Sequence, residues 1–224
     1  MKSLSLSFLL ACGLIAFVGK AQTHKPYTPT RFPDRLILGW QGNPATSQSV
    51  NWRTDSSVVG AVGAIHEADA SPDFVKKATI VPAVTEKVLI EGKQILYHSV
   101  HFKDLKPDTK YSYRVGAGEE WSEWFHFKTA KDQPAPFSFL YFGDAQNDLR
   151  SLWSRAIRGA YSAFPSVQFM LHAGDLINNS NADWQWGEWF EAGGWITGMV
   201  PTLASPGNHE YFKDDAGARR VSMH

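Results

Sequence analysis

Three apolar runs of the sequence each stop at a glycine followed by a polar residue, and this repeated ending constrains the fold most. The runs begin at Phe139, Phe169 and Pro201, and they end at Gly143-Asp144, Gly174-Asp175 and Gly207-Asn208-His209-Glu210. In an open α/β sheet the carboxyl ends of parallel strands meet at one edge, and ligands bind in the crevice beyond that edge. Glycine before each polar residue lets the backbone turn sharply and approach a ligand closely. The pattern therefore predicts three neighbouring parallel strands that deliver Asp144, Asp175 and Asn208 to one place.

The segment between the first two runs has helical periodicity. Apolar residues recur every third or fourth position from Leu149 to Phe164, and Asn147 or Asp148 can cap the helix that this stripe predicts. With strands at 137–142 and 167–172 it forms a βαβ unit, whose crossover should be right-handed. This half of the chain is therefore predicted to be α/β.

Short strands separated by turns, without helical periodicity, occupy the first half of the chain. The predicted strands are Arg35–Trp40, Ser49–Thr54, Ser57–Val62, Ala78–Val81, Ile95–Phe102, Tyr111–Val115 and Trp124–Lys128. About seven short strands in about a hundred residues predict a two-sheet β-sandwich. The Pro-Asp turn and the strand that follows, over residues 104–115, resemble the penultimate strand of fibronectin type III-like domains, in which tyrosines pack back on the corner.

The chain is predicted to divide into three parts. Residues 1–21 have the pattern of a signal peptide, with Lys2, an apolar run and small residues at Gly19 and Ala21, so cleavage is expected after Ala21. The run is shorter than the ~20 apolar residues that span a membrane, so no transmembrane span is expected. An uncleaved anchor, or a lipoprotein modified at Cys12, is the alternative to a secreted or periplasmic protein. The sandwich is assigned to residues 22–132 and the α/β part to residues 133–224, with a proline-bearing boundary between them.

Charge narrows the class of partner. The formal net charge of the 224 residues is zero, which argues against capture of nucleic acid or of an anionic membrane surface. A small phosphorylated substrate needs only local positive charge, which a metal can provide. The sequence carries no information about the oligomeric state.

The residues at the three strand endings are suited to metal chemistry. Carboxylates and an asparagine carbonyl are hard oxygen donors, which favour Mn, Fe, Zn or Mg over copper. Asp175 could bridge two ions, with Asp144 on one and Asn208 on the other, and ions ~3.5–4 Å apart promote phosphoryl transfer. His209 could bind a phosphate oxygen or protonate a leaving group. The alternative, Asp144 and Asp175 as helix N-caps, is less favoured because the endings recur in order.

These motifs resemble the first three motifs of the calcineurin-like metallophosphoesterases. With a fibronectin-like sandwich in front of them, the chain is most similar to the purple acid phosphatase-like branch of that family. The resemblance implies a dinuclear centre of Fe, Zn or Mn, in which Asp144 binds the first metal, Asp175 bridges and Asn208 binds the second. It places His209 near the substrate phosphate. It implies a secreted phosphoesterase that attacks phosphate esters with metal-bound hydroxide, in the manner of an acid phosphatase.

The chain departs from the family pattern at two positions. Purple enzymes have a tyrosine three residues after the bridging aspartate, where this chain has Asn178, and other members have a histidine where it has Gln146. We therefore expect a non-purple site in which Gln146 or Asn178 contributes a weaker carbonyl ligand. The family's remaining histidine ligands lie in later motifs, so the chain resembles an N-terminal half with an incomplete α/β domain that is inactive by itself.

Two alternatives remain open at this point. The same fold could serve a phosphodiesterase or nucleotidase, because the substrate-contacting loops cannot be read from the sequence. The protein could also be a catalytically inactive surface-binding protein. The aromatic run Trp184–Phe190, in a second predicted helix over residues 182–195, could then stack on a sugar or a nucleobase, or it could simply anchor the helix to the domain.

Overall fold

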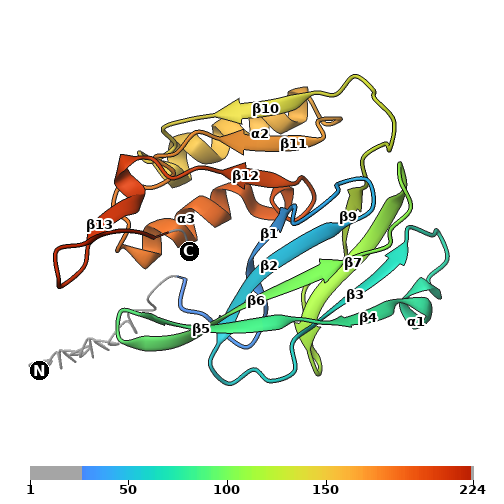
Figure 1. The fold of residues 1–224 in the computed structure, drawn as a ribbon, viewed down its shortest axis with the longest axis horizontal. Helices are drawn as coiled ribbons and strands as arrows, with labels where there is room; N and C mark the ends of the chain where they lie inside the picture. The colour runs from blue at the N-terminus through green and yellow to red at the C-terminus, as the bar shows by residue number, and fades with distance from the viewer. Residues whose placement is uncertain (1–26, 223–224) are drawn as a thin grey trace, which may run out of the picture.

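The computed structural model describes residues 27–222, which form a β-sandwich and a parallel α/β layer packed beside it (Figure 1). The predicted signal peptide 1–21, with Cys12, lies outside the described residues. The predicted architecture, a β-sandwich followed by an α/β domain, is confirmed. The predicted domain bounds 22–132 and 133–224 stay predictions.

Two antiparallel sheets make the sandwich. The first contains, in spatial order, β1 (Asp34–Gly39), β2 (Gln48–Asp55), β6 (Lys93–Phe102) and β5 (Val84–Ile90). The second contains β4 (Thr79–Pro82), β3 (Val62–Glu67) and β7 (Lys110–Ala117), with β8 (Glu120–Trp121) and β9 (Phe125–Lys128) both paired to β7. A short helix α1 (Phe74–Lys77) precedes β4.

Alternating side chains of both sheets fill the sandwich core. Trp52, Phe102 and Tyr113 are almost completely buried there, and the ring of Tyr113 packs against Phe102 and Phe125. The hydroxyl of Tyr111 accepts the backbone N–H of Lys106 at 2.8 Å. The predicted packing of a tyrosine back onto the Pro-Asp corner is therefore confirmed.

One predicted strand of the sandwich is wrong, and the longest strand that was not predicted is β5. Residues 57–61 are not a strand, because Ser57 donates its N–H to Asp55 Oδ1 at 2.9 Å and Gly60 has a φ of 71°. Pairing with β7 starts only at Val62. Strand β5 joins β6 through a two-residue turn at Glu91 and Gly92, with φ values of 48° and 74°. Positive φ at both positions is the geometry of a type I′ hairpin, which Glu-Gly announces more weakly than Asn-Gly.

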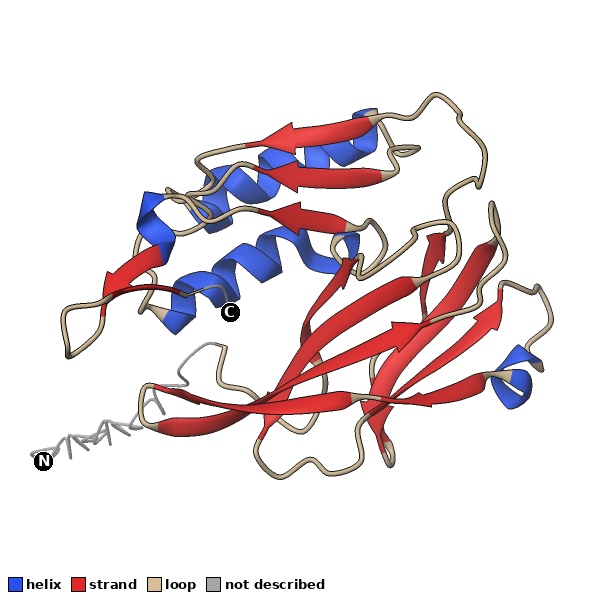
Figure 2. Cartoon of the chain, viewed as in Figure 1, coloured by secondary structure: helices blue, strands red, loops and turns tan. Residues whose placement is uncertain are grey.

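The α/β part is built on three parallel strands in the order β10 (Phe139–Phe142), β11 (Phe169–His172) and β12 (Thr202–Ala204) (Figure 2). The crossover from β10 to β11 is a π-helical turn, η1 (Leu149–Trp153), continued by α2 (Ser154–Ala163). The crossover from β11 to β12 is α3 (Asp183–Gly193) with the 3₁₀ turn η2 (Gly194–Ile196). After β12 come η3 (Asn208–Glu210) and a hairpin of β13 (Tyr211–Lys213) and β14 (Arg219–Val221).

The first crossover begins differently from a simple capped helix. Asp148 stands at the N-cap as predicted, but with φ 52° and without a side-chain cap bond. Its carbonyl instead accepts the N–H groups of Ser151, Leu152 and Trp153 at 3.1, 2.8 and 3.3 Å. Because the Asp148 carbonyl accepts N–H groups up to five positions ahead, the crossover starts with a π-helical turn, which is wider than an α-helical one. The spacing of apolar residues does not distinguish the two kinds of turn.

The two helices cover the sheet face that carries Met170 and His172. These residues are buried against Ile157 of α2 and Trp189 of α3. Along β10 the alternate residues point the other way, and Tyr141 is exposed. Among residues 27–222, no helix is long and apolar enough to cross a membrane.

The sandwich and the α/β layer are joined by direct hydrogen bonds. Thr197 donates its hydroxyl to the Leu36 carbonyl at 2.8 Å and accepts the Leu38 N–H on its own carbonyl at 2.9 Å. The buried Tyr113 hydroxyl donates to the Gly198 carbonyl at 2.6 Å. These bonds place β1 beside the segment that leads into β12, so the two parts have a fixed relative orientation.

Candidate active site

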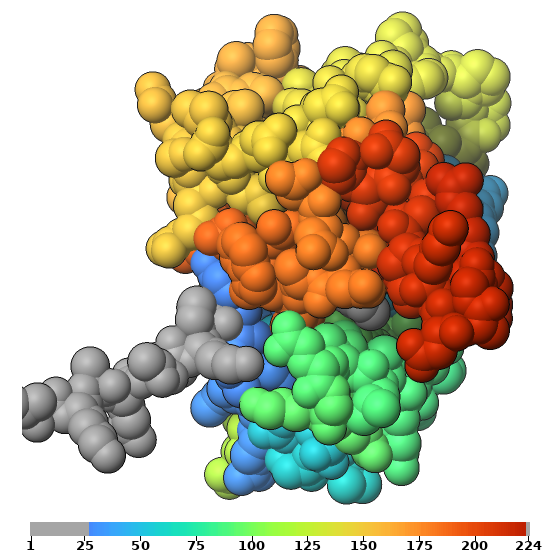
Figure 3. All heavy atoms as spheres, turned by 90° about the vertical axis from the view of Figure 1, so that its left-hand side faces the viewer, coloured from blue at the N-terminus to red at the C-terminus, as the bar shows by residue number. Residues whose placement is uncertain are grey.

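The three strand endings converge as predicted. Because β10, β11 and β12 are adjacent and parallel, the residues after them leave from the same edge, and Figure 3 looks onto this edge, where the yellow, orange and red segments meet. The two glycines make the approach possible. A Cβ on Gly174 would lie 2.4 Å from the Gly207 nitrogen, and one on Gly207 would lie 2.2 Å from Asp175 Oδ1. The second and third loops therefore pack backbone to backbone at the edge.

Asp144 and Asp175 have the same unusual backbone conformation. Both have φ 52°, and the Asp144 N–H donates to the Gly174 carbonyl at 3.3 Å. Left-handed geometry at a non-glycine residue is uncommon and gathers at functional sites. In the described residues no helix begins at either aspartate, so the N-cap alternative is wrong. The Asp144 side chain is exposed and that of Asp175 is half-buried, so both carboxylates remain accessible.

His209 is attached at two points to the loop that follows β11. Its backbone N–H donates to Asp175 Oδ1 at 3.1 Å, and its ring Nδ1 lies 2.8 Å from the carbonyl oxygen of Asn178. A carbonyl can only accept, so Nδ1 carries a proton, and Nε2 is the ring nitrogen on the side away from Asn178. Asn208 directly before it is exposed at the same edge. All four predicted site residues are thus gathered at one end of the sheet.

Glu210 is a site residue for which sequence reasoning gave no role. Its side chain is completely buried, and its carboxylate accepts four backbone N–H groups. Oε2 accepts from Asp175 at 2.9 Å and Gly207 at 2.7 Å, while Oε1 accepts from Leu176 at 2.8 Å and Ile177 at 3.3 Å. Glutamate three residues after the start of a helical turn is the spacing of a capping box, which could have revealed it.

Gln146 and Asn178 occupy the two positions that depart from the family pattern. The Gln146 N–H donates to the Asp175 carbonyl at 3.0 Å, and its side-chain oxygen is buried without a hydrogen-bond partner among the described residues. Asn178 is exposed, and its side-chain N–H lies 3.4 Å from the Asn147 side-chain oxygen. An unpaired buried carbonyl is energetically unfavourable, so of the two residues Gln146 is the stronger candidate for a carbonyl ligand.

The donors at this edge fit a hard cation. They are carboxylate oxygens of Asp144 and Asp175 and amide oxygens of Asn208 and Gln146, and the buried Gln146 oxygen has no hydrogen-bond partner within residues 27–222. Within residues 27–222 no group of three or more His, Cys, Asp or Glu side chains gathers as a metal site would require. The described residues therefore offer oxygen donors for part of a coordination shell and no histidine cluster.

A recess of about 340 Å³ opens beside the edge, lined by residues that include Gln146, Asn178 and Trp184. The aromatic run on α3 divides around it. Trp186 and Trp189 are 2% exposed and belong to the core, whereas Trp184 is 49% exposed and faces the recess. The anchoring interpretation is therefore confirmed for Trp186 and Trp189, and Trp184 remains available for contact with a ligand.

Two histidines are almost completely buried. Burial lowers the pKa of His172 to about 4, and neither of its ring nitrogens has a partner among the described residues. Burial also lowers the pKa of His98 to about 4, and its ring nitrogens lie 2.8 Å from the Thr54 hydroxyl and 2.9 Å from the Thr85 hydroxyl. His98 therefore packs inside the sandwich.

Comparison with known proteins agrees with this architecture. The family described as "Purple acid Phosphatase, N-terminal domain" matches residues 33–129, and the family described as "Calcineurin-like phosphoesterase" matches residues 137–222. The chain belongs to the purple acid phosphatase-like metallophosphoesterases. Its predicted family is therefore confirmed, with the two domains in the predicted order.

Relatives of this purple acid phosphatase-like chain are longer proteins. It is 33% identical over 128 residues to acid phosphatase type 7 of Danio rerio, and the aligned region covers 54% of this chain and 28% of the relative. A purple acid phosphatase from seeds of yellow lupin (Lupinus luteus) has a similar fold, with a TM-score of 0.67, 20% identity and 84% of this chain covered. The structure of PhoD gives a TM-score of 0.51 at 14% identity over 81% of this chain. The chain spans 37% and 39% of these two structures.

Proposed function

We propose that the protein is an exported, metal-dependent phosphoesterase that hydrolyses phosphate esters in the manner of an acid phosphatase. The observation that carries the proposal is the convergence of Asp144, Asp175 and Asn208 at one sheet edge. His209 is tied there to Asp175 and to the Asn178 carbonyl at 3.1 and 2.8 Å. A packing or capping role accounts for neither the left-handed aspartates nor the unpaired Gln146 oxygen.

The donor residues have distinct roles in this proposal. Asp144 would hold a first ion, Asp175 would bridge and Asn208 would hold a second, while Gln146 would direct its unpaired oxygen to the first. A dinuclear centre of Fe, Zn or Mn supplies Lewis-acid stabilisation of the developing charge on phosphate. With Asn178 in place of a tyrosine there is no phenolate, so the metal-loaded protein is expected to lack an intense visible charge-transfer band.

His209 acts on the leaving group. Hydrolysis breaks the bond between phosphorus and the ester oxygen, and that oxygen needs a proton as it departs. With its Nδ1–H bonded to the Asn178 carbonyl, the ring presents Nε2 to the substrate, and the imidazolium form, protonated on both ring nitrogens, would donate its Nε2 proton to that oxygen. Glu210 supports this arrangement because it ties residues 175–177 and Gly207 to one buried carboxylate.

The test measures metal content together with hydrolysis of p-nitrophenyl phosphate and bis-p-nitrophenyl phosphate. It is made on the chain of 224 residues and on the longer product if the reading frame continues. Bound metal and turnover that are both lost in Asp175→Asn, but not in the exposed control Asp132→Asn, support the proposal. Preference for the diester would indicate the phosphodiesterase alternative. A protein that binds no metal and cleaves neither ester would refute the proposal in favour of a binding protein.

Export has its own test. We propose cleavage after Ala21, so the mature protein isolated from its host should begin at Gln22. An intact N-terminus, or a lipid on Cys12, would contradict this part of the proposal.

A further inference from the structure

The loop that follows Asp175 is held by one side chain of α3. The Gln185 side-chain oxygen accepts the N–H of Asn178 at 3.0 Å and the N–H of Asn179 at 2.8 Å. The same stretch gives the Asn178 carbonyl to the ring of His209 at 2.8 Å. Gln185 and His209 are therefore bonded to the two sides of one peptide group, the one between Asn178 and Asn179.

The planarity of that peptide group couples the two residues. Its N–H and C=O point in opposite directions within one rigid plane, so fixing the direction of the Asn179 N–H fixes the direction of the Asn178 C=O. The carbonyl in turn sets where the imidazole of His209 lies. Asn178 and Asn179 are exposed, so without Gln185 their N–H groups would bond to water and the plane could rotate.

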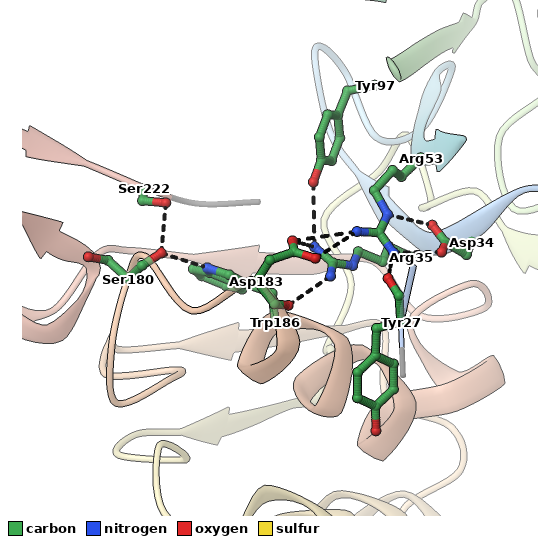
Figure 4. A network of polar contacts seen from close by, with 9 residues as sticks. All are labelled: Tyr27, Asp34, Arg35, Arg53, Tyr97, Ser180, Asp183, Trp186 and Ser222. Carbon is green, nitrogen blue, oxygen red and sulfur yellow. Dashed lines mark hydrogen bonds and ion pairs between the residues drawn. The ribbon is translucent and has the colours of Figure 1, made fainter. Parts of the chain in front are cut away.

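The first turn of α3, which carries Gln185, is held by contacts of Asp183 that reach into the sandwich (Figure 4). Two residues earlier on the same turn, Asp183 receives Arg35 Nη1 at 2.7 Å and Arg53 Nη1 at 3.1 Å on its carboxylate. Arg35 Nη2 also donates to the Asp183 carbonyl at 2.9 Å. Both arginines are buried, and Arg53 is held by a second carboxylate, that of Asp34, at 2.7 Å.

The core side of the helix completes the support. Trp186, which follows Gln185, is buried and donates its ring N–H to the Ser180 carbonyl at 3.4 Å, and Ser180 also accepts the Ser222 hydroxyl at 3.1 Å. The first turn of α3 is thus clamped on both sides. Gln185 is left with few ways to move relative to the loop.

We propose that Gln185 is a positioning residue for His209, and that the sandwich holds Gln185 in place through its ion pairs with Asp183. The inference rests on the proposed phosphoesterase function. Gln185 would act through the peptide between Asn178 and Asn179, whose carbonyl lies against the His209 ring.

The test compares Gln185→Leu with Gln185→Glu. Leucine removes the acceptor and leaves both N–H groups unpaired, whereas glutamate keeps an acceptor of the same reach. The matched control is Gln168→Leu, because Gln168 also accepts a backbone N–H, that of Ser138 at 2.7 Å, at the opposite end of the same sheet. All variants are made in the metal-loaded protein, in whichever of the two lengths, the 224-residue chain or the longer product, is active.

The decisive readout is leaving-group dependence. A displaced proton donor should matter most for an alkyl phosphate such as glycerol phosphate and least for p-nitrophenyl phosphate, whose phenolate leaves without protonation. We expect Gln185→Leu to lower kcat on the alkyl ester by about 10- to 100-fold, since a displaced acid should lose only part of the roughly 10²- to 10⁴-fold that general acid catalysis contributes, and on the aryl ester by only a few fold. Gln185→Glu should restore most of the loss. Equal losses on both esters, or no loss, would overturn the proposal.

A second readout separates this inference from the proposed function. Amide hydrogen exchange at Asn178 and Asn179 should accelerate in Gln185→Leu and stay unchanged in Gln168→Leu, whether or not the protein is active. Unchanged exchange in Gln185→Leu would overturn the positioning role even in an active enzyme. If the wild type cleaves neither ester, the proposed function fails and the role of Gln185 in catalysis fails with it, while accelerated exchange would still show that Gln185 holds the loop.

The link to the sandwich is tested by combining variants. Asp183→Asn should show the same preference for loss on the alkyl ester, and the double variant with Gln185→Leu should lose no more than Gln185→Leu alone. Multiplied losses in the double variant would show that Asp183 and Gln185 act separately.

Discussion

Replacing Glu210 with glutamine should strongly destabilise the α/β part, although it changes the side chain by one atom. The wild-type carboxylate accepts four N–H groups, two on each oxygen, and is completely buried. In Glu210→Gln one oxygen becomes an NH₂ group that points its own donors at two backbone N–H groups. Two of the four bonds are therefore lost, and two buried donors are left unpaired.

The expected magnitude follows from those contacts. A hydrogen bond to a charged group contributes about 1.5–3 kcal/mol, so two lost bonds correspond to about 3–6 kcal/mol. The variant avoids the desolvation of a buried carboxylate, which offsets part of the loss, so we expect a fall of about 3 kcal/mol in the free energy of unfolding. For a chain of this size that is a drop of about 6–12 °C in Tm.

Urea unfolding followed by tryptophan fluorescence measures this directly, because Trp153, Trp186 and Trp189 lie in the affected core. Glu123→Gln, at an exposed position, is the matched control and should change the free energy by less than about 0.5 kcal/mol. A fall of less than 1 kcal/mol in Glu210→Gln would show that the four N–H groups find other partners, and the structural role given to Glu210 would be wrong.

Three further predictions concern the rest of the described chain. His98 and His172 are held neutral with pKa values of about 4, below the unfolded value near 6.5, so stability is complete above pH 6.5 and is lost as pH falls from 6.5 through 4. Each should contribute a loss of about 2 kcal/mol between pH 7 and pH 5, and an unchanged pH dependence of urea unfolding in His172→Phe would contradict this. Tyr111→Phe leaves the Lys106 N–H without its acceptor and should lower the free energy of unfolding by about 1 kcal/mol. An unchanged urea midpoint would show that the bond between Tyr111 and Lys106 does not stabilise the fold. Asp183→Asn leaves buried arginine charge poorly compensated and should lower Tm by several degrees in calorimetry, and a Tm equal to that of the wild type would refute this ion-pair argument.

The sequence predicted those parts of the site that depend on a strand and its ending. An apolar run followed by glycine and a polar residue specifies both the buried strand and the turn that exposes the side chain, so Asp144, Asp175 and Asn208 could be placed at one edge. The same logic placed His209, because it follows Asn208 directly. These are local patterns, and parallel pairing converts them into a shared location.

Residues that act across the fold could not be predicted in this way. Glu210 and Gln185 accept N–H groups of the loop after β11, which lies 33–35 positions before Glu210 and 6–7 positions before Gln185. The capping-box spacing points only to the bond between Glu210 and Gly207, and no periodicity marks the others. The wrong strand at 57–61 has a related cause, since β-branched Val58 and Val59 favour a strand but the Ser57 bond to Asp55 and the glycine that follows turn the chain there.

The buried ionic cluster of Arg35, Arg53 and Asp183 links the sandwich to the loop beside the site. Desolvating Arg35, Arg53 and Asp183 is unfavourable, and apolar residues of similar volume often stabilise a protein as well or better. Apolar residues cannot fix an orientation in this way, because a guanidinium group donates to a carboxylate in only a few geometries. The bonds of Arg35 and Arg53 to Asp183 therefore fix the first turn of α3 against β1 and β2. That turn carries Gln185, and the peptide that Gln185 holds carries the partner of His209. The sandwich is therefore part of the framework that orients the site, and treating it as an independent binding module leaves this cluster without a function.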